Sequence, residues 1–316
     1  MTQPLVGGKV VEYTWAEALQ EARKMAQYLI DQDYEPGSKI AMVSKNCASF
    51  VIAELAIWMA GHTTVALYPT INEETGSYIL EHSEAKLIFV GKLDTWDEIQ
   101  RAIPADMPKI AMPQAPKTDF TKWEDIMSST KPLEGNPDRE EKDLALILYT
   151  SGSTGRPKGV MHGFGPISDV ARRMVKTLSI TGQDRMLSYL PLAHVFERSC
   201  VDFTSLVGRS HLFFAESLDT FVQDLNRCKP TLFVSVPRLW LKFQLGVLKK
   251  MPQSRLNLLL KIPVVRGLIK KKILTGLGLD QVRFAVSGSA PVPAELIEWY
   301  RSLGLNLYEG YAMSED

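Results

Sequence analysis

The chain has 316 residues, of which 45% are hydrophobic and 23% are charged, a length and composition that allow a large core or two subdomains of a globular protein. Its 36 lysine and arginine residues balance 36 aspartate and glutamate residues. This balance argues against the positive field of a nucleic-acid-binding protein and against an acidic, disordered tail. We therefore expect a small-molecule partner and no nucleic acid.

The three cysteines, Cys47, Cys200 and Cys228, are widely spaced in apolar surroundings, which favours reduced core thiols over a disulfide framework or a zinc site. No apolar run approaches the roughly 20 residues that span a bilayer, and the first ten residues lack the pattern of a signal peptide. We expect a cytoplasmic protein that is soluble or, at most, peripheral at the inner face of a membrane.

Helices and strands are predicted to alternate through the first half of the chain. Hydrophobic periodicity and turn signals predict a helix over 13–31 with Thr14 as N-cap, a strand over 39–43, a buried helix over 50–60, a strand over 63–67, a helix over 73–83 and a strand over 86–90. Residues 104–138 are rich in Pro, Lys and Asp and show little periodicity, so we expect a surface excursion there.

The second half repeats the alternation. The predicted elements are a strand over 144–148, a helix over 168–178, strands over 186–189 and 211–214, a helix over 218–228, and strands over 232–236 and 282–286. Such a rhythm is typical of an α/β protein whose parallel sheet carries helices on both faces, with the second half forming a second layer.

The stretch YTSGSTGRPKGV, 149–160, directly follows the apolar run 144–148. Its glycines let backbone N–H groups approach an anion, its Ser and Thr residues add hydroxyl donors, and Lys158 adds a charge, which is the chemistry of a phosphate cradle. A Walker loop has Gly before its lysine and Ser or Thr after it, whereas Lys158 lies between Pro157 and Gly159, so we exclude a P-loop. Taken alone, the stretch also fits a Gly- and Ser-rich surface turn.

Three further stretches follow in order: YLPLAHVFERS (189–199), AVSGSAPVP (285–293) and YEGYAMSE (308–315). Together with the loop they resemble the AMP-forming acyl-adenylating family, which includes acyl-CoA synthetases, luciferase and nonribosomal adenylation domains. YLPLAHVFER resembles the long-chain fatty acyl-CoA synthetase branch. The resemblance implies an α/β core of two stacked, mainly parallel sheets between helices, in αβαβα layers, with approximate subdomains 34–165 and 1–33 plus 166–316.

The resemblance also implies an activity. A long-chain fatty acid–CoA ligase, an acid-thiol ligase, uses ATP and Mg²⁺ to convert a fatty acid to acyl-AMP and then transfers the acyl group to CoA. The family's later ribose aspartate, its hinge and its mobile C-terminal domain with a catalytic lysine have no counterpart in these 316 residues, so we expect nucleotide binding without full activity. A homodimer is a further expectation. The alternative is a non-catalytic acyl- or nucleotide-binding module.

The implied nucleotide-binding residues belong to the phosphate loop, the adenine turn and the last motif: Thr150, Ser151, Gly152, Ser153, Thr154, Gly155, Lys158, Gly288, Ser289, Ala290, Pro291, Tyr311, Ala312, Met313 and Ser314. By resemblance, the loop holds the β and γ phosphates, and Lys158 supports the loop or the leaving pyrophosphate. Tyr311 stacks on adenine, and Ser314, where the family usually has Thr, contacts the α-phosphate.

Glu315 resembles the family's acidic magnesium ligand, with Thr150 as a second ligand. Ala312 replaces the family's usual glycine, which would press a methyl group toward the nucleotide or the acyl tunnel. Read without the resemblance, Tyr308 and Tyr311 would be aromatic residues of a core strand.

His194 is implied as a catalytic residue beside the reacting carboxylate, together with Lys158 and Glu315, and Val195 and Phe196 as walls of the acyl pocket. A histidine after an apolar strand also fits a hydrogen-bonded structural residue, and both readings stay open at this point. Arg198 and Glu197 are adjacent, which favours a local ion pair.

The stretch LLLKIPVVRGLIKKKIL, 258–274, mixes apolar and basic residues. It fits either a segment that rests on an anionic bilayer or a helix hairpin with a solvated basic edge, broken by Pro263 and Gly267. The second interpretation is the more common one for such a stretch.

Overall fold

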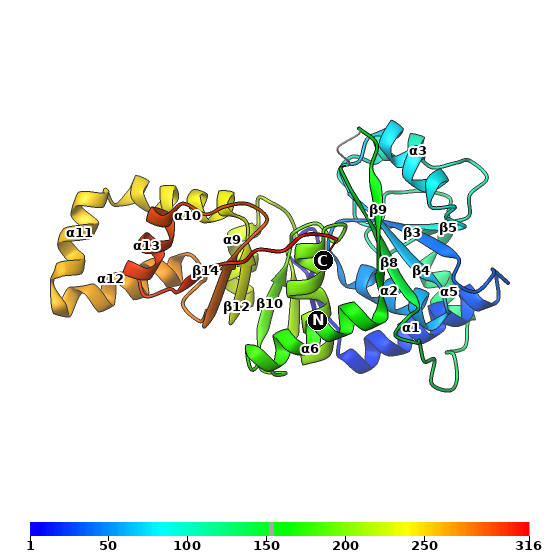
Figure 1. Cartoon of the computed structure of the whole chain (residues 1–316), viewed down its shortest axis with the longest axis horizontal. Helices are drawn as coiled ribbons and strands as arrows, with labels where there is room; N and C mark the ends of the chain where they lie inside the picture. The colour runs from blue at the N-terminus through cyan, green and yellow to red at the C-terminus, as the bar shows by residue number, and fades with distance from the viewer. Residues whose placement is uncertain (152–154, 316) are drawn as a thin grey trace.

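The computed structural model describes residues 1–151 and 155–315, and its strands form sheets of seven, four and three members there (Figure 1). The seven-stranded sheet contains, in spatial order, β7 (Thr121–Lys122), β6 (Lys109–Ala111), β5 (Leu87–Val90), β3 (Lys39–Val43), β4 (Thr63–Leu67), β8 (Leu144–Thr150) and β9 (Lys158–Gly163). All neighbouring strands are parallel except β8 and β9.

Side-chain alternation along β3 explains why helices cover both faces of this sheet. Ile40 and Met42 face a core that contains α1 (Trp15–Ile30) and α2 (Ala48–Met59), whereas Ala41 and Val43 face a second core with α3 (Glu73–His82). Helix α1 begins as expected, because the Thr14 side chain accepts the Glu17 N–H and Glu17 in turn accepts the Thr14 N–H, in a capping box.

The second layer consists of two smaller sheets that lie side by side. One contains β10 (Arg185–Ser188), β11 (His211–Phe214), β1 (Thr2–Pro4) and β2 (Val10–Glu12) in that order, and the other contains β12 (Leu232–Ser235), β13 (Phe284–Ser287) and β14 (Leu307–Glu309). The Thr231 N–H donates to the Arg185 carbonyl oxygen at 3.0 Å, which joins them next to β10 and β12. The expected pair of mainly parallel layers is therefore confirmed, with the second layer split in two.

Helices surround this second layer. They are α6 (Phe164–Thr177), α7 (Val195–Glu197), the π-helical segment η2 (Arg198–Asp202), α8 (Phe203–Gly208), α9 (Phe221–Cys228), α10 (Pro237–Lys250), α11 (Gln253–Lys261), α12 (Pro263–Gly276) and α13 (Ala294–Ser302). The helix hairpin predicted over 258–274 is confirmed as α11 and α12. Its break lies at Ile262 and Pro263, and the expected break at Gly267 is wrong, since Gly267 lies inside α12.

Two predictions about segments between the main elements are wrong. The expected surface excursion over 104–138 contains β6, β7 and α5 (Trp123–Ser129), and it follows α4 (Trp96–Ile99) and η1 (Gln100–Ala102). The sequence also predicted no strand between 148 and 168. Strand β8 continues to Thr150 and pairs antiparallel with β9, which begins at Lys158.

Contacts between the layers lie where parallel strands end. Asn46, which follows β3, donates to Ser188 Oγ at 2.7 Å and to the Leu190 carbonyl oxygen at 2.8 Å. The Lys92 ammonium, which follows β5, donates to the Glu216 carbonyl oxygen beyond β11. The carboxyl ends of the two layers therefore meet at one seam, the place where open α/β sheets bind ligands.

A buried ion cluster also joins the two layers, between α2 and η2. The fully buried Arg198 guanidinium donates to both carboxylate oxygens of Glu54 on α2, and to Asp202 Oδ2 at 2.8 Å. Its Nε donates to the Leu192 carbonyl oxygen at 2.5 Å. The expected ion pair between Arg198 and Glu197 is wrong, because a residue on the facing helix, far away in sequence, takes its place.

Glu197 points elsewhere, toward Asn46, whose Nδ2 lies 3.3 Å from Glu197 Oε1. Among the described residues, Glu197 Oε2 has no hydrogen-bond partner. Burial raises the pKa of Glu197 to about 8, because a carboxylate loses its water there and finds no cation of its own.

This pKa shift predicts a pH-dependent stability. The folded state holds the Glu197 proton up to about pH 8, whereas the unfolded chain releases it near the ordinary value of 4.5, so stability falls as the pH rises between those values. Glu197→Gln keeps the shape of the side chain and stays neutral at every pH. We therefore expect its free energy of unfolding to fall less between pH 5 and 8 than that of the wild type, by a few kcal/mol at most, on the order of 1.4 kcal/mol per unit of pKa shift. Thermal unfolding of both proteins between pH 5 and 8.5 measures the effect.

Glu298→Gln, at an exposed position on α13, is the matched control for the amide substitution. The same pH dependence in Glu197→Gln and in the wild type would contradict the prediction.

Candidate functional site

The motifs AVSGSAPVP (285–293) and YEGYAMSE (308–315) lie just beyond the carboxyl ends of two adjacent strands. β13 ends at Ser287 and leads into the turn 288–291, and β14 ends at Glu309 and leads into 310–315. The Gly310 N–H donates to the Ser287 carbonyl oxygen at 2.8 Å, and the Gly288 N–H to the Ser235 carbonyl oxygen at 3.2 Å. Hydrogen bonds along the sheet thus hold the two motifs side by side.

The turn 288–291 has a constrained backbone. Ser289 adopts a φ of +66°, a left-handed conformation that is costly for a residue with a side chain and that is found at ligand-binding turns. The Glu309 carboxylate accepts the Val292 N–H at 3.0 Å and so ties the turn to β14. Ala290 and Pro291 complete the turn, and both are exposed.

Phe196, in the motif YLPLAHVFERS (189–199), lies against the turn 288–291. A Cβ added at Gly288 would lie 2.7 Å from the Phe196 ring, so only glycine allows this approach. Val195, beside it, packs against the main core. The segment predicted to border the acyl pocket therefore lies against the turn predicted to frame adenine.

His194 caps the short helix that Phe196 belongs to. Its Nδ1 accepts the Phe196 N–H at 3.1 Å, which leaves the proton of the neutral ring on Nε2. Burial lowers the pKa of His194, so the ring is neutral at pH 7. The structural role that the sequence left open is present, and the second ring nitrogen keeps an N–H donor for a ligand.

The hairpin of β8 and β9 carries the described residues of the stretch that was predicted to bind phosphate. Thr150 and Lys158 are partners across it, Gly155 has a φ of +89°, and Ser151 and Lys158 are exposed. Gly152, Ser153 and Thr154, predicted here as phosphate contacts, lie outside the described residues. Arg156 stands over the Tyr78 ring at 5.6 Å, so the hairpin presents two cations, Arg156 and Lys158.

The last motif reaches the same hairpin. The Glu315 carboxylate lies close enough to β9 to influence the His162 imidazole. Burial and Arg198 lower the pKa of His162, and Glu315 opposes them. Tyr311 is 86% exposed, and the Ala312 and Met313 side chains are exposed too. The prediction of Tyr311 as a core strand residue is wrong, whereas Tyr308 lies in β14 and stacks on Phe284.

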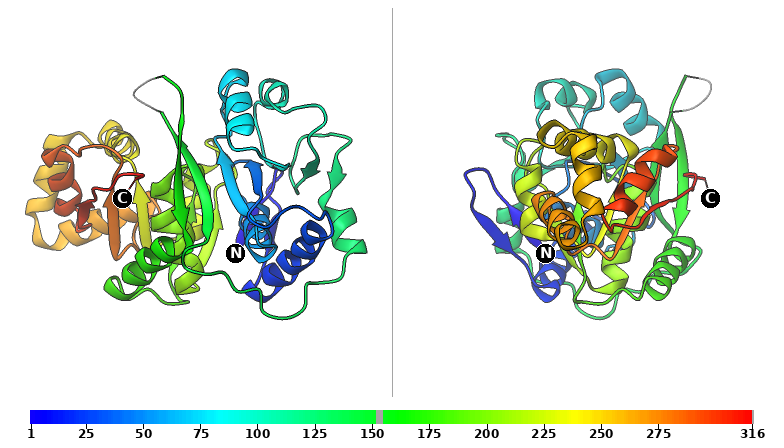
Figure 2. Two further views of the ribbon diagram at one scale, coloured as in Figure 1. Left: turned by 45° about the vertical axis from the view of Figure 1, so that its right-hand side comes forward. Right: turned by 90° about the vertical axis from the view of Figure 1, so that its left-hand side faces the viewer.

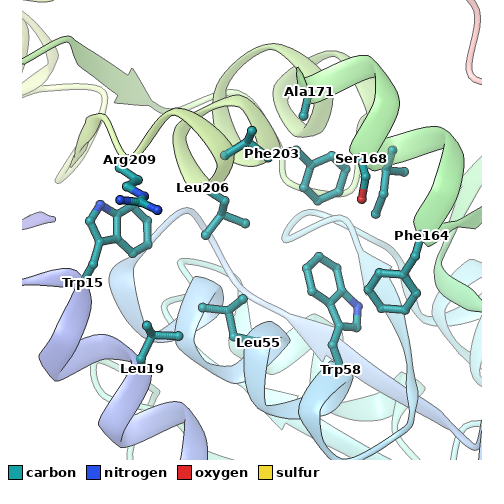
Figure 3. A pocket seen from close by; sticks show the side chains of 12 residues that line it. Trp15, Leu19, Leu55, Trp58, Phe164, Ser168, Ala171, Phe203, Leu206 and Arg209 are labelled. Carbon is teal, nitrogen blue, oxygen red and sulfur yellow. The ribbon is translucent and has the colours of Figure 1, made fainter. Parts of the chain in front are cut away.

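Two apolar cavities lie near these motifs in sequence or in space, one without and one with a motif residue in its wall. The first, of about 410 Å³, opens between α1, α2, α6 and α8, where Trp15, Leu19, Leu55 and Trp58 face Phe203 and Leu206 (Figure 3). Arg209 is the one charged residue of its lining. This cavity contains Phe203, and the buried residues Arg198 and Asp202 separate Phe203 from His194 along the chain. We therefore do not assign the acyl chain to this cavity.

The second cavity, of about 630 Å³, lies between α9, α10 and α12. Its wall includes Tyr189, the first residue of YLPLAHVFER, and the aromatic side chains of Phe221 and Phe243. Its lining also contains the three lysines Lys242, Lys250 and Lys272. An apolar space beside lysine side chains suits an amphiphile with an anionic head.

The sequence did not reveal Glu54, Asp202 or Asn46 as part of this region. Glu54 and Asn46 lie in segments that carry no recognisable motif, and they meet Arg198 or Glu197 only in the folded protein. The available signals were the Glu54 carboxyl group inside an otherwise apolar helical stretch and the spacing of four residues between Arg198 and Asp202.

Solved structures share this fold. The chain matches the adenylation domain of a carboxylate reductase from Mycobacterium chelonae with a TM-score of 0.79 and 18% identity, over 99% of this chain and 54% of that one. It matches ATP-bound MatB from Rhodopseudomonas palustris with a TM-score of 0.74 and 22% identity, over 98% of this chain and 56% of that one. The expected adenylate-forming fold is confirmed.

Curated relatives are similar along almost the whole chain. Fatty acyl-CoA synthetase A of Dictyostelium discoideum is 29% identical over 350 aligned residues, which cover 99% of this chain and 52% of the relative. Long chain acyl-CoA synthetase 2 of Arabidopsis thaliana is 26% identical over 97% of this chain and 53% of its own length. The chain thus spans about half the length of the curated relatives it matches.

The family model of AMP-binding enzymes matches residues 3–316, a range that includes all four motifs and both sheet layers. The chain belongs to the AMP-binding enzyme family.

Proposed function

We propose that this chain is the adenylate-forming core of a long-chain fatty acid–CoA ligase. The observation that supports it best is the convergence of separate motifs at one seam. Phe196 lies against Gly288, and the Gly310 N–H donates to the Ser287 carbonyl oxygen, so the motifs at 189–199, 285–293 and 308–315 lie together. As approximate subdomains we propose 34–165 and 1–33 plus 166–316.

The first chemical step brings two anions together. A carboxylate oxygen attacks the α-phosphorus of ATP, the bond to the β-phosphate oxygen breaks, and pyrophosphate leaves; the CoA thiol then displaces AMP from the acyl carbon. Two unit charges about 3.5 Å apart repel by about 5 kcal/mol at an effective dielectric near 20. The site must therefore supply donors and cations for both anions.

The proposed roles follow the residue chemistry. Lys158 and the hydroxyls of Thr150 and Ser151 bind the phosphates that leave, while the His194 Nε2–H donates to the carboxylate that attacks. Ser314 is proposed at the α-phosphate and Tyr311 at adenine. We propose their neighbours Ala312 and Met313, whose side chains are exposed, as further nucleotide contacts.

The donor chemistry at the end of the chain fits Mg²⁺. An exposed carboxylate, Glu315, and a hydroxyl, Thr150, are hard oxygen ligands of the kind that Mg²⁺ shares with phosphates and water. When bound, the ion would neutralise phosphate charge, and Glu315 with Thr150 would hold it. The magnesium ion, the cytoplasmic location and the homodimer remain predictions.

For the acyl chain we propose the cavity between α9, α10 and α12. It is apolar, it adjoins Tyr189, and each buried methylene of a ligand would contribute up to about 0.8 kcal/mol there. Chains of about 12 or more carbons should therefore bind far better than acetate.

The first test concerns the nucleotide. Lys158→Ala should weaken ATP binding by about tenfold to a hundredfold, the usual worth of a charged hydrogen bond, and leave fatty-acid binding unchanged. Calorimetric titration measures both affinities. Lys122→Ala, an exposed lysine on β7, is the matched control. ATP affinity equal to that of the wild type would remove Lys158 from the site.

The second test concerns His194. In His194→Asn the side-chain oxygen can still cap the helix, but the Nε2–H donor is lost. Binding of a long-chain fatty acid in the presence of AMP should weaken by about tenfold, whereas binding of the fatty alcohol of the same length should not change. Equal losses for acid and alcohol would show that His194 acts on the fold alone.

The third test fills the cavity. Gly246 is part of the cavity lining, and a Cβ added there meets no atom within 4 Å, so Gly246→Phe is a suitable substitution for filling the cavity. We expect this variant to lose at least tenfold in affinity for palmitate and nothing for ATP. Gly246→Ala, which adds a single methyl group, is the control. Unchanged palmitate binding in Gly246→Phe would place the acyl chain elsewhere.

The alternative is a non-catalytic acyl- or nucleotide-binding module, which the match to half of each relative's length keeps in consideration. Pyrophosphate exchange with a panel of carboxylic acids distinguishes the two. A ligase core exchanges label in an acid-dependent way, at the reduced rate expected of this chain, whereas a binding module shows no acid-dependent exchange.

A further inference from the structure

We propose that the hairpin of α11 and α12 docks on an anionic lipid bilayer, with exposed aliphatic side chains inserted among the lipids and basic side chains at the headgroups. Docking does not depend on the ligase activity. The benefit to that activity, access to acyl chains dissolved in the bilayer, does rest on the proposed function.

The first observation is an asymmetric charge distribution. Between Asp224 and Asp280 the chain has 12 basic and no acidic residues, whereas the rest of the protein holds the other 24 basic residues and all 36 acidic ones. A neutral protein thus has one strongly cationic segment. Such a segment is attracted to an anionic surface while the remaining residues, which are net acidic, are repelled from it and orient the molecule.

The second observation is the exposure of aliphatic side chains at the bend of the hairpin. Four residues within eleven positions are far more exposed than aliphatic residues usually are: Leu258 (62%), Ile262 (41%), Val264 (81%) and Leu268 (68%). They come from the end of α11, the break and the first half of α12. A cluster of exposed aliphatic side chains in a cationic segment marks a surface that is covered by another apolar phase.

The exposed aliphatic residues of α12 lie on one face of the helix. Val264, Leu268 and Lys271 recur at helical spacing and are all exposed, while Ile273, on the other side of the helix, is buried. A lysine on this face can lay its methylenes along the aliphatic surface and keep its ammonium at the headgroups.

The hairpin is also accessible. It forms one end of the long axis of the molecule (Figure 1), and the view along that axis shows α11 and α12 in front (Figure 2). The second half of α12 lines the proposed acyl cavity with Lys272 and Ile273. The docking surface and the cavity are thus built on the same helix.

The inferred mode is attachment and not insertion across the bilayer. None of the helices in residues 1–151 and 155–315 is both long and apolar enough to cross a membrane. A short amphipathic hairpin that lies in the headgroup region needs no such length. An acidic protein or a nucleic acid would be attracted to the same charges, but it would not account for the exposed Leu258, Val264 and Leu268.

The test uses the purified chain and vesicles of phosphatidylcholine with or without phosphatidylserine, with binding measured by co-sedimentation. The variant Lys261→Gln/Arg266→Gln/Lys271→Gln should bind the anionic vesicles about a hundredfold more weakly, since each basic side chain near such a surface contributes about fivefold. Its control is Lys117→Gln/Lys122→Gln/Lys131→Gln, which removes three exposed lysines outside the cationic segment and should bind like the wild type.

The second variant, Val264→Ser/Leu268→Ser, keeps every charge and should lose at least about tenfold. Because the changed side chains are exposed, thermal unfolding of all variants should match the wild type.

The proposal is supported if both hairpin variants lose binding and the control does not. It is overturned if the wild type ignores anionic vesicles, if it binds neutral vesicles equally well, or if the serine variant binds like the wild type. Loss of DNA binding in the glutamine variant, with no vesicle binding by the wild type, would assign the surface to nucleic acid instead.

Discussion

The Arg198 guanidinium is held by Glu54 on one side and Asp202 on the other, and this buried cluster fixes how the two sheet layers meet. Burial raises the pKa of both carboxyl groups, while Arg198 opposes the shift. Such a cluster adds little net stability, but removing one member leaves a buried charge unpaired, at a cost of several kcal/mol. The interaction is therefore most important as a constraint on geometry. It holds α2 of the first layer against η2 of the second.

That constraint extends to the candidate site through the helical segment that begins at His194. The imidazole caps the segment, Phe196 lies against Gly288, and Arg198 anchors the segment one turn later. A shift of this helix would move the cap, the aromatic ring and the adenine turn together. Electrostatic stabilisation of two anions requires donors that are fixed before the ligand arrives, so a helix anchored by a buried ion cluster is a suitable support.

The second half of the molecule has a different physical character at its far end. Around β12 and β13 it is a tightly packed core in which the Trp240 ring packs against both Phe233 and Tyr300. Toward α11 and α12 the packing decreases, aliphatic side chains become exposed and acidic residues are absent from the segment. Chemistry on anions and contact with an apolar phase would thus occupy separate regions of one chain, joined by α10 and α12.

The sequence by itself determined the element types and the fold class, because local signals decide these. Period-two and period-3.6 patterns predicted β3, β4, α1 and α2 within about two residues, and Thr14 with Glu17 marked the start of α1. Four short motifs were sufficient to identify the family, whose model matches residues 3–316.

Only the tertiary structure decided how these parts meet. Strands β6 and β7 are too short to show a period. Strand β6 forms by pairing with β5, β7 by pairing with β6, and β9 by pairing with β8. Adjacent in sequence, Glu197 and Arg198 predicted an ion pair, but Arg198 turns to Glu54, 144 positions away, because a bidentate carboxylate on the facing helix satisfies a buried guanidinium better. Exposure was decided in the same way. A stretch such as 258–274 has the same pattern whether its leucines are buried or face outward, and only packing against α10 and its neighbours determines which of them remain outside.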